Sequence, residues 1–276
     1  MKKVVLITGA SSGIGEATAK KLLSQGHVVY GGARRLERME GIKKLGAKVQ
    51  KLDVTKSEDI KAAVDKVIKE QGRIDVLFNN AGYGLYGTVE DVTMEDARYQ
   101  FDVNIFGLAD ITKEVLPHMR KQKSGTIINT SSMGGKMYTP LGAWYHATKH
   151  ALEGWSDCLR LEVESFGIDV VVVEPGMINT EFSEVVAGAA VERSKKSAYK
   201  EITEALLSAM SPESGSNISM SEPSVIADVV AEVVNAKKPK TRYIKGAMAR
   251  PMVFMRRFLG DRGFDKVLRR TMLGQK

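Results

Sequence analysis

The chain has 276 residues, of which 43% are hydrophobic, enough for one large α/β core, and no Pro-, Gly- or Ser-rich stretch divides it. The formal charge of +8 is concentrated at the C-terminal end, because residues 237–276 contain thirteen Lys or Arg and only two Asp. The remainder is slightly acidic, which excludes a basic nucleic-acid-binding body. The single cysteine, Cys158, excludes an intrachain disulfide and is interpreted as a small packed helix residue.

Apolar strand-like runs alternate with helical periodicity along the chain. Strands are predicted at residues 4–7, 28–33, 49–52, 76–79, 126–130, 170–173 and 242–244. Helices are predicted at residues 13–25, 58–71, 94–120 with a break, and 141–166. This alternation predicts an α/β fold, a Rossmann-like doubly wound seven-stranded parallel sheet with helices on both faces. The first apolar run is too short for a signal peptide or a membrane span, so a cytoplasmic protein is expected.

A glycine-rich turn follows the first strand and opens the first helix. Its residues are Thr8, Gly9, Ala10, Ser11, Ser12, Gly13, Ile14 and Gly15. Glycines let backbone N–H groups approach a pyrophosphate, whose charge is favoured by the N-terminus of the helix. The spacing differs from the standard Gly-x-Gly-x-x-Gly, but the position directly after an N-terminal strand predicts a dinucleotide site.

A tyrosine and a lysine four residues apart, Tyr145 and Lys149, lie on the predicted helix 141–166. An i, i+4 pair shares one helix face, so the ammonium of Lys149 is expected close to the phenol, where it would favour the ionised form of Tyr145. The pair predicts a proton donor beside the dinucleotide.

The ordered motifs resemble those of the classical short-chain dehydrogenase/reductase family over roughly residues 3–245. The matching positions are the glycine turn, Asn79 to Gly82, Asn104, Ser131 with Ser132, Tyr145 with Lys149, and Pro175 with Gly176. The resemblance implies that Ser132 hydrogen-bonds the substrate carbonyl and that Tyr145 donates the proton during reduction. It implies that Lys149 also holds the nicotinamide ribose. Asn104 would organise a water chain that resupplies the proton.

The residues after the second strand bear on the choice of cofactor. Ala33 stands where an acidic residue would bind the ribose 2′-OH of NAD, and Arg34 and Arg35 follow it. Guanidinium groups suit a phosphate, so NADP(H) is predicted, although a solvated arginine pair opening the next loop is the alternative. The resemblance implies further cofactor contacts at Gly9, Ser11, Ser12, Gly13, Ile14, Gly15, Asp53, Val54, Asn80, Ala81, Gly82, Tyr145, Lys149, Pro175, Gly176, Ile178 and Thr180.

The predicted substrate pocket is apolar. Its residues are Tyr83, Leu85, Met133, Tyr138, Leu141, Met177 and Phe182, although core packing alone would also make these positions apolar. Residues 183–222 are polar and small, as in a substrate lid. An apolar ketone, aldehyde or alcohol fits better than a sugar or a charged acid, and the motifs most resemble the hydroxysteroid and retinol dehydrogenase-like branch.

Beyond the predicted domain 1–245, residues 246–276 form a basic extension with the spacing of an amphipathic helix. Its apolar stripe is expected to dock on the substrate cleft or on a neighbouring subunit. Peripheral contact with an anionic membrane is the alternative. By resemblance, the helices at residues 94–120 and 141–166 imply a homodimer or homotetramer.

Three functional hypotheses follow. The first is an NADP(H)-dependent oxidoreductase acting on a hydrophobic carbonyl or alcohol. The second is a lipid ketone reductase of acyl-glycerone-phosphate type at a membrane surface, and the third is a non-catalytic NADP-binding redox sensor. No metal is predicted, because His146 and His150 lack an acidic or cysteine partner nearby.

Overall fold

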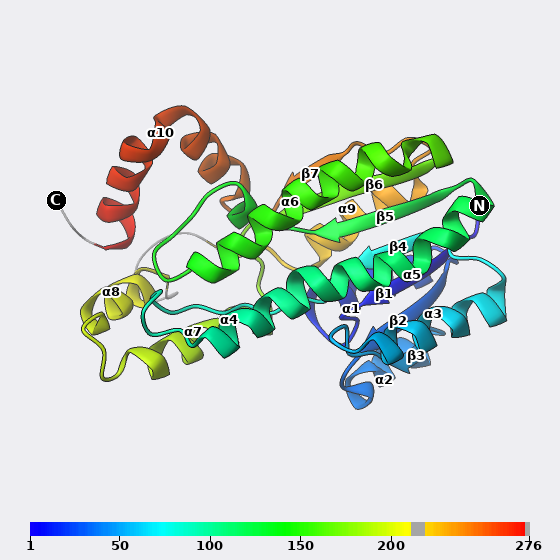
Figure 1. The fold of residues 1–276 in the computed structure, drawn as a ribbon, viewed down its shortest axis with the longest axis horizontal. Helices are drawn as coiled ribbons and strands as arrows, with labels where there is room; N and C mark the ends of the chain where they lie inside the picture. Colours follow the sequence, from blue (N-terminus) through cyan, green and yellow to red (C-terminus); the bar gives the residue numbers. More distant parts are fainter. Residues whose placement is uncertain (211–218, 274–276) are drawn as a thin grey trace.

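In the computed structural model, the described residues form one sheet of seven parallel strands in the order β3-β2-β1-β4-β5-β6-β7 (Figure 1). Residues 1–210 and 219–273 are described, apart from the side chains of residues 182–187, 189, 207, 209 and 210. The strands are β1 (Val4–Thr8), β2 (Val28–Ala33), β3 (Lys48–Lys51), β4 (Val76–Asn79), β5 (Gly125–Thr130), β6 (Ile168–Pro175) and β7 (Arg242–Lys245). The predicted doubly wound sheet is confirmed.

Helices surround the sheet and extend beyond one end of it. The longer ones are α1 (Gly13–Ser24), α3 (Ser57–Gln71), α4 (Met94–Phe101), α5 (Gly107–Gln122), α6 (Ala143–Val163), α7 (Glu181–Ser194), α8 (Lys200–Met210), α9 (Ser224–Asn235) and α10 (Ala249–Met272). The shorter ones are η1 (Leu36–Met39), α2 (Glu40–Lys44), η2 (Asp102–Phe106), η3 (Met133–Gly135) and η4 (Glu164–Phe166).

The core has two layers, one on each face of the sheet. Helices α1 and α9 bury residues such as Leu22 and Val230 on one face. Helices α3, α5 and α6 bury Val64, Val115 and Leu159 on the other. Because both faces are covered, the central strands are largely apolar, and every residue of β1 is buried. The strand order reverses between β1 and β4, so the carboxyl ends of these strands border the crevice where such sheets bind ligands.

The break predicted within residues 94–120 is present. Helices α4 and α5 are separated by the π-helical turn η2, which contains Asn104. π-Helical turns inside longer helices are frequent at functional sites, because they turn a side chain away from the regular helix faces.

The prediction for Cys158 is wrong, because its side chain is exposed on α6. The neighbouring residue Leu159 faces the sheet, so Cys158 points outward. The sequence analysis also did not predict α2 or α9. Helices α7 and α8 occupy much of the predicted lid, whose residues 211–218 lie outside the described residues.

The C-terminal extension forms α10, which is kinked at Gly260, a residue with φ of 63°. It lies beside α8, beyond the end of the sheet (Figure 1). Helix α10 also contacts β7 and η3, and η3 follows directly after Ser132. The extension therefore packs against this chain's own residues next to Ser132, and both its role at the substrate cleft and the domain boundary at residue 245 stay predictions.

Candidate active site

The turn after β1 is locked to the end of β4. The hydroxyl oxygen of Thr8 accepts hydrogen bonds from the backbone N–H groups of Asn80 and Ala81, each at 3.0 Å. The side-chain amide of Asn80 donates to the carbonyl oxygen of Gly9 at 3.1 Å. A Cβ atom on Gly15 would lie 2.2 Å from that same carbonyl oxygen, so only glycine permits this close packing.

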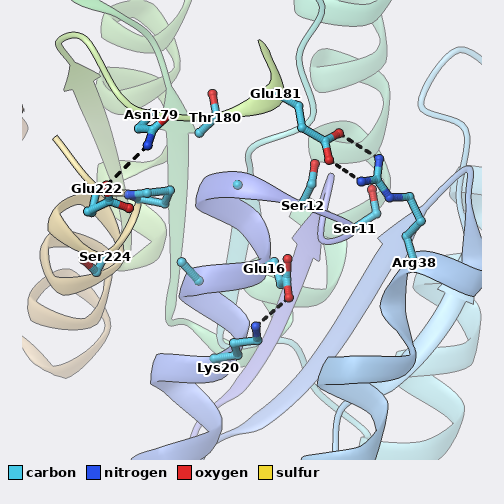
Figure 2. A pocket seen from close by; sticks show the side chains of 13 residues that line it. Ser11, Ser12, Glu16, Lys20, Arg38, Asn179, Thr180, Glu181, Glu222 and Ser224 are labelled. Atoms are coloured by element: carbon cyan, nitrogen blue, oxygen red, sulfur yellow. Dashed lines mark hydrogen bonds and ion pairs between the residues drawn. The ribbon is translucent and has the colours of Figure 1, made fainter. Parts of the chain in front are cut away.

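A cavity of about 650 Å³ opens beside the turn (Figure 2). Ser11, Ser12 and Thr180 line it, together with Arg38. Ser12 precedes α1, and its side chain makes no capping hydrogen bond to the helix. Because the glycines expose the backbone and the helix N-terminus favours anions, these residues fit the phosphates of a dinucleotide.

The two arginines predicted to bind the cofactor phosphate point in different directions. Arg34 donates a hydrogen bond to the hydroxyl of Tyr99 at 2.8 Å. Arg35 instead lies 4.0 Å from the carboxylate of Glu181. The sequence analysis missed Arg38, which also pairs with Glu181 and lines the cavity. The sequence did offer a signal, because Arg35 and Arg38 are three residues apart and would share one face of a helical turn.

The other predicted cofactor contacts lie near strand ends. Asp53 follows β3 and accepts hydrogen bonds from the backbone N–H and the hydroxyl of Thr55, at 3.0 and 2.8 Å. Burial raises the pKa of Asp53, but the Thr55 hydrogen bonds and the charge of Arg34 outweigh burial and hold this pKa below its usual value. Beyond the ends of β3, β4 and β6 lie Val54, Asn80, Ala81, Gly82, Gly176, Ile178 and Thr180, and Pro175 ends β6.

Ser132, Tyr145 and Lys149 converge beyond the end of β5. The hydroxyl of Ser132 accepts a hydrogen bond from the backbone N–H of Gly134 at 3.0 Å and is hydrogen-bonded to Tyr145. The ammonium of Lys149 lies 5.8 Å from the ring centre of Tyr145. Lys149 also donates to the carbonyl oxygen of Thr130, at 2.8 Å.

The electrostatics of the Tyr145–Lys149 pair differ from the expectation that Lys149 would favour the ionised phenol. Burial raises the pKa of Tyr145, and the Ser132 hydrogen bond offsets only part of this increase. Burial lowers the pKa of Lys149 to about 8, against the opposing charge of Glu153. Desolvation is the largest cause of both shifts, and it disfavours the charged form of each side chain.

Asn104 clamps the segment that follows β4. Its side-chain oxygen accepts from the backbone N–H of Tyr83 at 2.8 Å, and its amide nitrogen donates to the Tyr83 carbonyl oxygen at 2.9 Å. The same nitrogen donates to the hydroxyl of Thr148 at 3.1 Å. Asn104 thus connects the π-helical turn, the segment after β4 and the helix that carries Tyr145.

The sequence analysis missed the site residue Tyr86. Its ring centre lies 5.7 Å from that of Tyr145, and burial raises its pKa. Nothing in the spacing of the motifs indicated this contact, although an aromatic residue soon after Asn80 and Gly82 was a weak signal.

The side chain of His146 has a structural role. Its Nε2 accepts from the backbone N–H of Thr139 at 3.0 Å, so Nδ1 carries the proton and donates to the carbonyl oxygen of Gly134 at 2.9 Å. Burial lowers the pKa of His146 to about 4. The imidazole therefore fixes residues 134–139, which follow Ser132, against α6.

Only part of the predicted substrate pocket lies together. Met133 and Tyr138 pack against buried Met137 and against three residues of α10, namely Met252, Phe264 and Leu268. The Tyr138 hydroxyl donates to Asp265 of the same helix at 2.8 Å. Helix α10 thereby completes an apolar, methionine-rich cluster, which we call the methionine-rich wall, against the segment directly after Ser132.

The remaining predicted pocket residues have other places. Leu85 is a core residue, 1% exposed, in a small cluster with Val92 and Ala97 that Tyr83 also contacts. Leu141 is buried, and its carbonyl oxygen accepts from the backbone N–H of Gly87 at 2.9 Å. Met177 forms a bridge with Ala247, in the segment leading to α10. The side chain of Phe182 lies outside the described residues.

Comparison with known proteins places the chain among related oxidoreductases. Residues 3–189 match the family described as short chain dehydrogenase. A "3-ketodihydrosphingosine reductase" of Bacteroides thetaiotaomicron is 48% identical over 182 residues, which cover 66% of each chain. A serine dehydrogenase complexed with NADP⁺ is 29% identical, with a TM-score of 0.75 over 88% of this chain and 94% of that one. A 3-ketoacyl-(acyl-carrier-protein) reductase of Brucella melitensis complexed with NADH is 26% identical, with a TM-score of 0.73 over 87% and 94%.

Two further observations concern residues 1–210 and 219–273. No group of three or more His, Cys, Asp or Glu side chains in this part of the chain is arranged to hold a metal ion. None of the helices in residues 1–210 and 219–273 combines the length and the hydropathy that crossing a membrane requires.

Replacing His146 by Phe is expected to destabilise the protein by about 1–3 kcal/mol at pH 7.5, because two buried backbone groups lose their partner. The folded-state pKa of His146 is about 4, below the ordinary 6.5, so its contribution is fully present above 6.5 and is lost as the pH falls toward 4. Denaturant unfolding at pH 7.5 and pH 5 should therefore give a smaller difference between wild type and His146→Phe at pH 5. The exposed neighbour provides the control His150→Phe, and equal pH effects in both variants would contradict this role.

Proposed function

Because the chain belongs to the short-chain dehydrogenase family, we propose that it uses NADPH to reduce a long-chain, apolar ketone to its alcohol. The observation that carries this proposal is the convergence of Ser132, Tyr145 and Lys149 beside the methionine-rich wall of α10. The family consists of oxidoreductases that act on CH–OH groups with a nicotinamide cofactor. Beyond this reaction class, we propose the long-chain ketone substrate and the preference for NADPH.

The bound nicotinamide would supply the hydride, and this chain's own residues would handle the proton and the charge. Hydride addition builds negative charge on the carbonyl oxygen, which the hydroxyl of Ser132 would stabilise by a hydrogen bond. Tyr145 would donate its phenolic proton to that oxygen. A raised pKa keeps Tyr145 protonated, which suits a proton donor in the direction of reduction.

Lys149 and Asn104 would support this transfer. With a pKa of about 8, Lys149 remains mostly charged at neutral pH and would stabilise the phenolate that forms. Its position next to the dinucleotide crevice also suits contact with the nicotinamide ribose. Asn104 would hold the segment carrying Tyr83 in place, whether or not it also organises a water chain.

The substrate class rests on the wall that α10 contributes. Methionine side chains are flexible and apolar, so this wall can adapt to an alkyl chain. The relative from Bacteroides thetaiotaomicron is named for 3-ketodihydrosphingosine, a long-chain amino ketone. We favour this class over a steroid or a retinoid, because an adaptable wall suits a flexible chain better than a rigid ring system.

Exposed apolar side chains support a dimer. Phe106, Leu161 and Phe166 are 61%, 71% and 40% exposed, and they lie in η2, α6 and η4. These elements belong to the two helical segments from which an oligomer was expected. A contact between two copies that buries these three side chains would remove them from water.

Contact with a membrane surface is favoured by a different patch. Phe254 and Phe258 on α10 stack with ring centres 4.3 Å apart and are 61% and 66% exposed. Leu259 is 46% exposed beside them, and Arg250 and Arg257 are exposed nearby on the same helix. Aromatic side chains flanked by arginines complement an anionic lipid surface. We propose a cytoplasmic enzyme that touches such a surface through this patch.

The first test concerns chemistry. Tyr145→Phe removes the proton donor, so turnover of a long-chain ketone with NADPH should fall at least about 100-fold. The dissociation constant for NADPH should stay within about threefold, because the ring and Lys149 remain. Tyr86→Phe removes a neighbouring buried hydroxyl and should reduce turnover by less than about tenfold. Turnover by Tyr145→Phe above a tenth of wild type would contradict the mechanism.

The second test concerns the cofactor. We expect a higher kcat/KM with NADPH than with NADH. The double variant Ala33→Asp, Arg34→Leu should lower the ratio of the two values by about 100-fold, because a charge-assisted contact is lost and a repulsive carboxylate is added. Lys43→Leu removes an exposed cation of α2 and should leave the ratio unchanged. Equal kcat/KM with both cofactors in the unmodified protein would refute the preference.

The third test concerns the membrane. The unmodified protein should float with vesicles that contain anionic lipid at low salt, and added salt should weaken this binding. Phe254→Ser with Phe258→Ser should abolish flotation but leave the turnover of a short soluble ketone unchanged, since both side chains are exposed. The control Leu45→Ser removes an exposed apolar residue elsewhere and should not affect flotation. Absence of binding by the unmodified protein at low salt would rule out this contact.

A further inference from the structure

An ion pair crosses the cavity beside the glycine turn. Arg38 belongs to η1, whereas Glu181 is the first residue of α7, and the guanidinium binds the carboxylate with two parallel hydrogen bonds. The bond from Nη1 to Oε2 is 2.7 Å long. Figure 2 shows this pair next to the side chains of Ser11 and Ser12, at the expected phosphate site.

Glu181 contacts two arginines, Arg38 and Arg35. Arg35 lies 4.0 Å from the same carboxylate, whereas Arg34 is hydrogen-bonded to Tyr99. Arg35 and Arg38 lie within five residues of the end of β2, the strand whose end faces the ribose 2′ position of a bound dinucleotide. Arg38 is therefore placed to bind a 2′-phosphate, but a carboxylate already occupies its two donor groups.

The ion pair can exchange partners easily. The side chains of Arg38 and Glu181 are 35% and 48% exposed, and ion pairs at this exposure contribute little to stability. A guanidinium group donates two parallel hydrogen bonds to a carboxylate or to a phosphate with the same geometry, and a phosphate carries more charge. The 2′-phosphate of NADPH would thus replace Glu181 on Arg38. This exchange breaks the ion pair and leaves the Glu181 carboxylate near the phosphate, and both effects weaken NADPH binding.

We propose that Glu181 determines cofactor selectivity, because its carboxylate competes with the 2′-phosphate of NADP(H) for Arg38 and so lowers the preference for NADPH over NADH. This inference rests on the proposed use of NADP(H) and identifies a residue that opposes it. NADH lacks the 2′-phosphate, so its binding does not require Arg38 to release Glu181.

The test compares dissociation constants for NADPH and NADH at one fixed ionic strength. Glu181→Gln should tighten NADPH binding about fivefold and leave NADH binding within about twofold. Arg38→Gln should weaken NADPH binding, and in the double variant the gain from Glu181→Gln should disappear, because the two residues act through one contact. The same difference should appear without the nicotinamide. Glu181→Gln should tighten the binding of adenosine 2′,5′-bisphosphate and leave the binding of adenosine 5′-monophosphate within about twofold.

The matched control is Glu222→Gln. Glu222 lines the same cavity and contributes the same charge, but its contact is the amide of Asn179 at 3.4 Å. This variant should change NADPH and NADH binding equally. The inference would be overturned if Glu181→Gln left the ratio of the NADPH and NADH dissociation constants unchanged. It would also be overturned if Glu181→Gln and Glu222→Gln changed this ratio equally. Failure of the unmodified protein to bind either cofactor would instead contradict the proposed function.

Discussion

The hydroxyl of Thr8 holds together the two strands between which the sheet reverses its order. It accepts from two consecutive backbone N–H groups beyond β4, and Asn80 returns hydrogen bonds to the carbonyl oxygens of Thr8 and Gly9. Leaving such buried groups without partners costs about 1–3 kcal/mol each, so this contact fixes the geometry of the crevice. The glycine turn, the cavity beside it and the segment carrying Tyr83 all take their positions from this junction.

The reacting groups depend on a second set of fixed contacts, which is built around α6. Lys149 is tied to the end of β5 through Thr130, Asn104 connects α6 to the segment after β4, and His146 holds the chain that follows Ser132. These contacts make the site partly buried and stiff. Burial then sets its electrostatics, because it raises the pKa of the Tyr145 phenol and lowers the pKa of the Lys149 ammonium.

The sequence predicted those features that depend on local pattern. Apolar runs located every strand to within a few residues, because strands buried on both faces leave little room for polar side chains. Ser132, Tyr145 and Lys149 were identified by resemblance, and the structure brings them together. The break in helix 94–120 was also expected, although its π-helical form was not.

Features that depend on partners distant in sequence were not predictable. Arg38 lies in a polar run that resembles a solvated loop; its spacing from Arg35 was a weak signal, and its contact with Glu181, 143 positions later, is what places it at the cavity. Leu85 and Leu141 resembled pocket residues, because apolar character does not distinguish a pocket wall from a core. The prediction that Cys158 is packed failed for a related reason, because a single cysteine does not show which face of its helix is buried.

Helix α10 combines two surfaces whose separation depends on one glycine. Its second half buries Phe264 and Leu268 against the segment after Ser132, whereas the first half leaves Phe254 and Phe258 exposed. Gly260 lies between them with φ of 63°, a conformation that side-chain-bearing residues adopt at a cost. With the kink, the second half of α10 packs against the segment directly after Ser132, and the first half presents aromatic side chains outward, so the proposed lipid contact lies on an element that also packs beside the candidate site.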